Sequence, residues 1–374
     1  MFRRSSVGDD GYFGKMWEFR FFMKKKIGFA LQLFLVIGIA VVTLVLMFRG
    51  KEAGQIRQCL THAKKGWVLA GAFLMIVFVF LEAVLLKTMF NGMKQKVSLW
   101  KCFLLSNVEY FFAQLTPGAA GGQPVQMIYM GSLGIDVLVG ALACMMITVL
   151  YKTTFLVIFL AALIFRNSLV VDAVSQVPFL FTFGILFQLA SISFLFSCVF
   201  FPSWAMKLVN GIINIGAKLH IVKDPDKTKA GISNSIRLYR KSSEFLKTHK
   251  LVILRMFIIT LVQRLSFFSV TFCVAKALGV QNVNWFSVVS VQTILSLSVD
   301  ALPIPGAAGA NELVFVNLQK TLFSPELMAT GLLLNRGITY YFLLVCSGIF
   351  TILLNVIPKK RKERHPVEVE ENGA

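Results

Sequence analysis

Charged side chains are scarce in this sequence of 374 residues: Asp, Glu, Lys and Arg together make up 15% of it. A soluble domain usually has about 25% charged and about 45–50% apolar residues, whereas 56% of this chain is hydrophobic. That much apolar surface cannot be buried in one water-soluble core, which excludes an ordinary soluble enzyme and a disordered chain. The composition predicts an all-α polytopic membrane protein.

Acidic residues are scarcer still. The chain has 18 Asp and Glu against 38 Lys and Arg, which gives a formal net charge of +20. No RNA- or DNA-binding motif accompanies this excess, so nucleic acid is not expected as a partner. The basic residues lie mostly between apolar runs, where anionic lipid headgroups and the cytoplasmic preference of Lys and Arg explain them. We therefore expect anionic phospholipids as partners.

Histidine and the common catalytic motifs are absent from the long apolar runs. The four histidines lie outside these runs, and the sequence has no H-E-x-x-H, G-x-S-x-G or P-loop motif. A membrane metalloprotease, a Ser–His hydrolase and a built-in ATPase are therefore disfavoured, and we expect no catalytic residue, metal site or cofactor. The six cysteines form no C-x-x-C pair, so we interpret them as small core hydrophobes.

Long apolar runs recur along the chain, and each can cross a hydrocarbon core of about 30 Å at about 1.5 Å per residue. The first run has 22 uncharged residues, whereas a signal-peptide core has about 7–15, so it is predicted to be a retained span. Four of the others have a charge in their interior, namely Glu82, Lys152, Arg264 and Arg336. The predicted spans are residues 27–48, 66–90, 135–165, 178–201, 251–278 and 328–358.

Two further apolar stretches are broken by Pro and Gly. Residues 102–115 lead into T-P-G-A-A-G-G-Q at 116–123, and residues 286–302 lead into P-I-P-G-A-A-G-A-N at 303–311. Pro and Gly at this density end a helix, and most of the flanking pieces are too short to cross. We predict two re-entrant helical hairpins beside about six spanning helices, giving up to eight membrane helices.

Basic residues in the loops predict the orientation of the chain. If the hairpins do not cross, the loop 202–250, with ten basic and three acidic residues, is cytoplasmic, as are both termini. Its two amphipathic runs are interpreted either as helices lying on an anionic leaflet or as helices packed under the bundle. We predict a plasma-membrane location. The predicted organisation is a basic cytoplasmic tail (1–26), a first membrane repeat (27–165), a span with a basic amphipathic cytoplasmic loop (166–250), a second membrane repeat (251–357) and a charged cytoplasmic tail (358–374).

The two Gly-rich turns are near copies, because P-G-A-A-G-G-Q at 117–123 matches P-G-A-A-G-A-N at 305–311. Each half of the chain then consists of a span, a hairpin and a span with a central basic residue. Lys152 falls opposite Arg336 after a four-residue slip. Three crossings in the first half would invert the second, and inverted repeats with broken helices are a transporter architecture whose matched breaks mark the binding site.

Each break can also hold an anion, because a restarting helix presents free N–H groups and the positive end of its dipole. The alternative is tight helix packing through small residues. A cation in the middle of a span costs about 2.5–3.5 kcal/mol and usually faces the bundle interior. The predicted lipid-headgroup-binding residues are Gly118, Gly121, Gly122, Gln123, Lys152, Arg264, Gly306, Gly309, Asn311, Glu312 and Arg336.

The candidate counter-charges to these cations are four acidic residues in or beside the apolar runs. Glu82 is expected to pair with Arg264 and fix helix orientation. Glu312, directly after the second turn, is expected to balance Arg336 or to carry a proton. The other two are Glu109 and Asp300.

The turns at 116–123 and 302–312 resemble those of the lysylphosphatidylglycerol synthetase transmembrane family, the flippase-like domain of the multiple peptide resistance factor. The string L-P-I-P-G-A-A-G-A-N-E at 302–312 is the most specific part, and the resemblance extends from about residue 27 to 357. It implies movement of a phospholipid such as lysylphosphatidylglycerol between leaflets, and resistance to cationic peptides. In full-length relatives a C-terminal soluble domain makes the lipid from aminoacyl-tRNA. Only 16 residues follow Pro358, so we expect no synthetase domain in this chain.

A phospholipid translocase is the function expected from these features. One alternative is lipid aminoacylation of the phosphatidylglycerol lysyltransferase type, by this chain or with a separate lipid-modifying enzyme as a partner. Transport of a polyprenyl-phosphate-linked lipid and a non-transporting membrane scaffold are the others. The sequence leaves the cargo, the energy source, the direction and the oligomeric state open.

Overall fold

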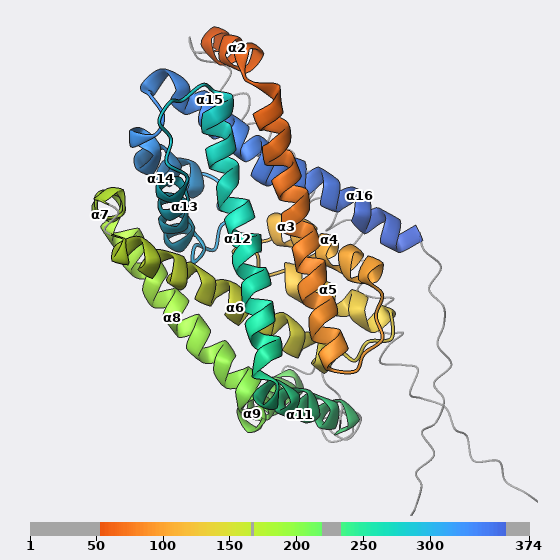
Figure 1. Cartoon of the computed structure of the whole chain (residues 1–374). Coiled ribbons are helices and arrows are strands. Elements are labelled where there is room, and N and C mark those ends of the chain that lie inside the picture. Colours follow the sequence, from red (N-terminus) through yellow and green to blue (C-terminus); the bar gives the residue numbers. More distant parts are fainter. Residues whose placement is uncertain (1–52, 166–167, 219–232, 357–374) are drawn as a thin grey trace, which may run out of the picture. The chain divides into compact units, whose positions relative to one another are not determined.

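The computed structural model describes residues 53–165, 168–218 and 233–356, and within these ranges the chain is all-α (Figure 1). The predicted first span at 27–48 and both predicted tails lie outside the described residues. From Gln58 onward the described residues belong to one compact unit, which contains all of the contacts discussed below. The helix α2 (Ala53–His62) leads into this unit.

Five described helices are long and apolar enough to cross a membrane, and they confirm the spans predicted after the first. Four have 23–28 residues, or about 35–42 Å at about 1.5 Å per residue. The fifth begins at Pro325, three residues before the predicted start, and contains a π-helical segment. They are α3 (Lys65–Gly92), α6 (Val137–Ile164), α8 (Pro178–Phe200), α12 (Lys250–Ala277) and the run of α15 (Pro325–Arg336), the π-helix η2 (Gly337–Phe342) and α16 (Leu343–Val356).

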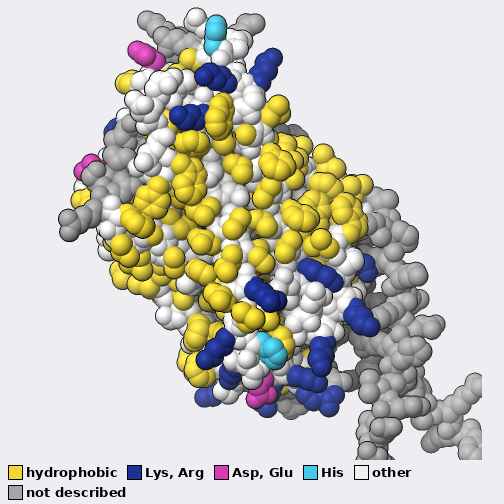
Figure 2. Space-filling view, in the orientation of Figure 1, with side chains coloured by type: hydrophobic (Ala, Val, Ile, Leu, Met, Phe, Trp, Pro, Cys, Tyr) yellow, Lys and Arg dark blue, Asp and Glu magenta, His cyan; other side chains and the backbone are white. Residues whose placement is uncertain are grey.

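The helices α3 and α12 pack side by side along their lengths and present apolar side chains outward. Leu69, Phe73 and Ile76 of α3 are 51–69% exposed, and Leu254 and Ile258 of α12 are more than half exposed. Figure 2 shows hydrophobic side chains covering the middle of this face, with Lys and Arg gathered mainly toward its two ends. A band of apolar surface between basic ends is the pattern expected of helices in contact with hydrocarbon and headgroups.

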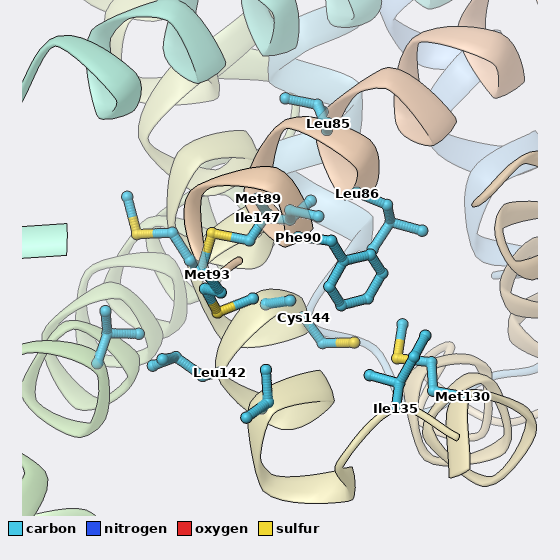
Figure 3. Close-up of a cluster of buried hydrophobic side chains, with 14 of the residues drawn as sticks. Leu85, Leu86, Met89, Phe90, Met93, Met130, Ile135, Leu142, Cys144 and Ile147 are labelled. Carbon is cyan, nitrogen blue, oxygen red and sulfur yellow. The ribbon is translucent and has the colours of Figure 1, made fainter. Parts of the chain in front are cut away.

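The interior contains an apolar core between α3, α6 and α5 (Gly122–Ser132). Figure 3 shows Met89 and Phe90 of α3 pointing toward Cys144 and Ile147 of α6, with Met130 of α5 nearby. All five side chains are at most 4% exposed. Four of the six cysteines are buried, which agrees with their prediction as core hydrophobes: Cys102, Cys144, Cys198 and Cys273.

Two helix–turn–helix hairpins form where Pro and Gly interrupt the apolar stretches. Their helices have 17, 11, 15 and 9 residues, or about 14–26 Å, so none alone spans about 30 Å of hydrocarbon. Ser98 and Asn284 cap the first helix of each hairpin by accepting a backbone N–H. The first hairpin is α4 (Leu99–Leu115) with α5, and the second is α13 (Trp285–Val299) with α14 (Ala310–Leu318) and the short η1 (Gln319–Thr321).

The basic loop contains α9 (Pro202–Lys218) and α11 (Ser233–Thr248). The second of these packs against the bundle, because the hydroxyl of Tyr239 donates to the Cys198 carbonyl at 2.8 Å and that of Ser243 donates to the Val199 carbonyl. For α11 the bundle-packing interpretation is therefore confirmed. The loop predicted near 166–177 contains a helix, α7 (Ser168–Gln176), because its buried apolar side packs against α13.

Candidate functional site at the broken helices

The two Gly-rich turns meet inside the unit. Pro117 and Pro305 form an antiparallel β-bridge, and the Gly118 N–H donates to the Ile304 carbonyl at 3.5 Å. The two prolines are equivalent positions of the sequence repeat, 188 residues apart. Antiparallel pairing of equivalent residues is what a local two-fold axis would produce. Inversion of the two halves across a membrane stays a prediction.

The turns also share an uncommon backbone conformation. The φ angles of Gly118 and Ala119 are 58° and 57°, and those of Gly306 and Ala307 are 57° and 50°. Glycine adopts this left-handed region freely, whereas alanine does so at a cost of about 1–2 kcal/mol. The repeated motif therefore encodes the same turn twice, including its strained alanine.

At the helix starts predicted to hold an anion, side chains of the protein accept backbone N–H groups. The Gly121 N–H donates to Oγ1 of Thr116 at 2.9 Å, and the Gly309 N–H donates to Oε2 of Glu312 at 2.6 Å. A carboxylate of the chain itself thus occupies the positive end of α14. Asn311 is half-buried beside it, and its N–H donates to the Ala307 carbonyl. A headgroup would have to displace Glu312 to use this position.

Gly122 serves helix packing rather than ligand approach. A Cβ at this position would lie 2.8 Å from the Glu109 carbonyl oxygen and 2.9 Å from the Cβ of Ala113, both on α4. The small-residue interpretation therefore holds for Gly122. Around Gly309, by contrast, a Cβ would meet nothing within 4 Å, so the second turn is open on that side.

Arg336 fixes the second turn to α15. Its Nε lies 2.6 Å from Oε1 of Glu312, and its Nη2 donates to the Gly306 carbonyl at 3.1 Å. The guanidinium also lies 5.3 Å from the centre of the Tyr340 ring. Two roles are expected for Glu312, and these contacts correspond to the first, in which it balances the charge of Arg336.

The two halves align without the predicted four-residue slip. The second helices after the turns, α6 and α15, begin at Val137 and Pro325, which are again 188 residues apart. This register places Thr148 opposite Arg336. Gln123 donates to Oγ1 of Thr148 at 2.6 Å, so each hairpin is tied to its next helix at the matched position. The slip was wrong because it aligned charges rather than helix starts, and Lys152 is not the counterpart of Arg336.

Lys152 is buried at the contact of α6 and α8. The residue is 6% exposed, and its Nζ donates to Oε1 of Gln188 at 2.9 Å while the Gln188 amide donates back to the Lys152 carbonyl at 3.0 Å. The Nζ lies 5.4 Å from the centre of the Tyr151 ring and 5.6 Å from that of Phe187. Its direct partners are therefore a neutral amide and two aromatic faces.

Arg264 of α12 lies against three aromatic rings. The guanidinium carbon is 4.6–5.8 Å from the ring centres of Phe78, Tyr151 and Phe155. Its Nε is buried without a hydrogen-bond partner in the described part of the chain. Arg264 repels Lys152 and attracts Asp300, the residue that ends α13 immediately before the second turn.

Glu82 binds neutral donors instead of the expected guanidinium. Its Oε2 accepts from the Tyr110 hydroxyl at 3.2 Å and from Nε2 of Gln263 at 2.8 Å. Arg264 attracts Glu82 through space, but the expected direct ion pair is not formed. The partners that sequence reasoning missed include Gln188 and Gln263, whose amides within apolar runs were the available signal.

The site thus has two parts. One is the structural ion pair of Glu312 and Arg336 at the second turn. The other, which we call the interior cation pair, consists of Lys152 and Arg264, which repel each other, are both attracted by Asp300 through space and have no direct carboxylate contact among the described residues. Such a pair can accept an anion.

Comparison with known proteins identifies the family. The chain is 23% identical over 286 residues to a protein of Archaeoglobus fulgidus named UPF0104 membrane protein, an alignment that covers 74% of this chain and 84% of the relative. The family model described as the lysylphosphatidylglycerol synthase TM region matches residues 31–347. With its membrane-type helices and paired turns, the chain belongs to the lysylphosphatidylglycerol synthase TM region family.

Proposed function

We propose that this membrane protein moves an anionic or aminoacylated phospholipid, such as lysylphosphatidylglycerol, between the leaflets of the cell membrane. The interior cation pair is the observation that carries the proposal. The family supports the choice of a phospholipid as cargo, and the phosphate is the part of that cargo that would lie at Lys152 and Arg264.

The energetics of the cation pair support an anionic ligand. A single cation at the centre of a span costs about 2.5–3.5 kcal/mol, and here two cations repel each other while a single carboxylate, that of Asp300, attracts both through space. Lys152 has a neutral amide as its hydrogen-bond partner, and the buried Nε of Arg264 has none. A phosphate would offset both charges and supply acceptors for the guanidinium. Arg336 is already satisfied by Glu312 and Gly306, so we assign it to the scaffold of the turn.

The contact between the turns is compatible with movement. One bridge and one hydrogen bond of 3.5 Å connect the backbones of Pro117–Gly118 and Ile304–Pro305. Such a small contact can open and close as the two halves rock, which is how transporters built from repeats expose a central site to either side. The π-helical segment at Gly337–Phe342 is a type of irregularity often found at functional sites.

The test is a leaflet assay in proteoliposomes of defined composition. Fluorescent phosphatidylglycerol is reconstituted with the protein, and dithionite bleaching reports the fraction that reaches the outer leaflet with time. The variant Lys152→Ala/Arg264→Ala should slow translocation at least about tenfold, equivalent to about 1.4 kcal/mol. The exposed Lys101→Ala variant removes one charge elsewhere and should match the wild type. If the folded double variant translocates lipid at the wild-type rate, Lys152 and Arg264 do not bind the headgroup. If the wild-type protein does not translocate lipid, the proposed function is rejected.

A further inference from the structure

Two carboxylates that the headgroup site does not use lie inside the bundle. Glu82 of α3 is 2% exposed, and Glu109 of α4 is half-buried. They interact electrostatically with each other, and both are attracted by Arg264. Two carboxylates that repel each other in a buried place, with one shared guanidinium, form a natural place to hold a proton.

The hydrogen bonds around these carboxylates leave an acceptor unused. Gln263 is 0% exposed, and its Nε2 donates to Glu82 while its Oε1 has no partner. A buried amide oxygen without a donor has lost its hydrogen bonds to water without replacement, which is unfavourable. Rotation of this amide by a half turn would present Oε1 to a protonated Glu82, whose O–H could then donate to it. The rotation would also break the bond that Nε2 donates to the Phe78 carbonyl at 3.1 Å, so the network favours the charged form of Glu82 in the arrangement described.

Glu109 connects this network to the first turn. Its Oε2 accepts from Nε2 of Gln126 at 3.0 Å, and Gln123 at the start of α5 also donates to it. Gln123 is the residue that binds Thr148 directly after the turn. Protonation of Glu109 would therefore change the hydrogen bonding of Gln123 at the start of α5.

The other charged and titratable groups that face the two carboxylates come from α4, α6, α12 and the end of α13. Through their interactions with Arg264, the groups of the headgroup site belong to the same electrostatic cluster. The groups are Tyr110 of α4, Cys144, Tyr151 and Lys152 of α6, Arg264 of α12 and Asp300 after α13.

We propose that Glu82 and Glu109 form a proton site that is linked to the headgroup site, so that binding of a lipid phosphate is accompanied by uptake of one proton by this carboxylate pair. The proposal rests on the proposed function for its cargo. The phosphate pairs with Arg264 and weakens the attraction between this guanidinium and the two carboxylates, which favours their protonated forms. Its own negative charge acts in the same direction. The proton comes from water, binds one carboxylate oxygen and is released when the lipid leaves.

This linkage gives the protein an energy source. If one proton moves with each lipid, a pH difference across the membrane biases the direction of lipid movement. A neutral lipid headgroup without a phosphate would not trigger uptake.

The decisive experiment measures protons taken up on lipid binding by the purified full chain in detergent. Short-chain dihexanoyl phosphatidylglycerol is titrated into a weakly buffered sample that contains a pH indicator, and calorimetry in two buffers of different ionisation enthalpy gives the same quantity independently. We expect uptake of up to one proton per bound lipid in alkaline buffer, at a pH where the buried pair still carries charge before the lipid binds. Glu82→Gln and Glu109→Gln should each reduce the uptake at least twofold. Glu326→Gln, an exposed carboxylate of α15, should not.

Experiments on the same protein preparations in proteoliposomes distinguish the proton linkage from the proposed lipid translocation. Translocation of fluorescent phosphatidylglycerol with no proton uptake on binding, and with no response to an imposed pH difference, overturns the linkage and leaves the function. Proton uptake on binding without translocation keeps the linkage and rejects the function. If both Gln variants fail to fold, the wild-type measurement alone decides, because binding without uptake is sufficient to reject the linkage.

Discussion

Glu312 shows how one side chain joins the backbone of a turn to a helix 24 residues away. One of its oxygens accepts the Gly309 N–H at the start of α14, and the other binds Arg336. We predict that Glu312→Gln lowers the free energy of unfolding by about 1–3 kcal/mol, because it weakens a helix cap and removes a partly buried charge pair. Thermal unfolding in detergent measures this, with the exposed Glu244→Gln as the matched control.

The pairing itself is tested by a double-mutant cycle. If Glu312 and Arg336 act together, Glu312→Gln/Arg336→Gln should cost less than the sum of the two single changes, because each single change leaves one charge unpaired. Additive effects would show that the two residues stabilise the turn independently. The expected coupling also separates Arg336 from the interior cation pair, since this cycle concerns stability and not lipid movement.

Sequence alone could identify the charged residues of the site but not their partners. Lys152, Arg264 and Arg336 stand out because a charge within an apolar span is costly and usually has a partner or a function. Which group each one meets depends on the rotation and register of neighbouring helices. The contact of Lys152 with Gln188 joins residues 36 positions apart, and no periodicity within one helix encodes it.

Glycine positions decide how closely the helices pack. At Gly184 of α8 an added Cβ would collide with the carbonyl oxygen of Leu297 on α13, whereas at Gly211 of α9 it would meet nothing within 4 Å. We predict that Gly184→Ala lowers the unfolding temperature, because backbone cannot move aside as a side chain can. Gly211→Ala should leave the temperature unchanged or raise it, since alanine is favoured in a helix by about 1 kcal/mol.

The comparison of these two variants is matched in chemistry, because each adds one methyl group to a helical glycine. Unfolding of both in the same detergent, followed by loss of the monodisperse peak on heating, gives the difference directly. Equal effects would show that α8 and α13 do not pack as closely as described. A lower stability of Gly211→Ala alone would contradict the open surroundings of that residue.

The elements were largely predictable because their physical causes are local. Length and hydropathy identified the long helices, and Pro and Gly marked both turns. The exceptions depend on tertiary packing: α7 forms because its apolar side is covered by α13, and the π-helical segment at Gly337–Phe342 interrupts a run that reads as one continuous helix. An irregularity of this kind adds a residue to a turn, and the glycine at its start does not by itself predict it.

For the whole molecule, the repeat predicted that two distant motifs would act together, and the structure brings Pro117 and Pro305 into one bridge. The Cα atoms of residues opposed in an antiparallel bridge lie about 4.5–5.5 Å apart, within the range of about 4.4–6.8 Å that a disulfide requires. We therefore predict that Pro117→Cys/Pro305→Cys forms a crosslink under mild oxidation, and that neither single variant does. Mass spectrometry of the joined peptides identifies it, so the four buried native cysteines can remain in place.

The crosslink also tests whether the halves must separate. If the turns open and close during each transport cycle, the oxidised double variant should lose most of its phosphatidylglycerol translocation, and reduction should restore it. The single variants provide the control for the loss of each proline, because they change the same backbone without joining it. Full activity of the crosslinked protein would place the movement elsewhere, for example at the π-helical segment after Arg336, whereas absence of a crosslink would contradict the contact itself.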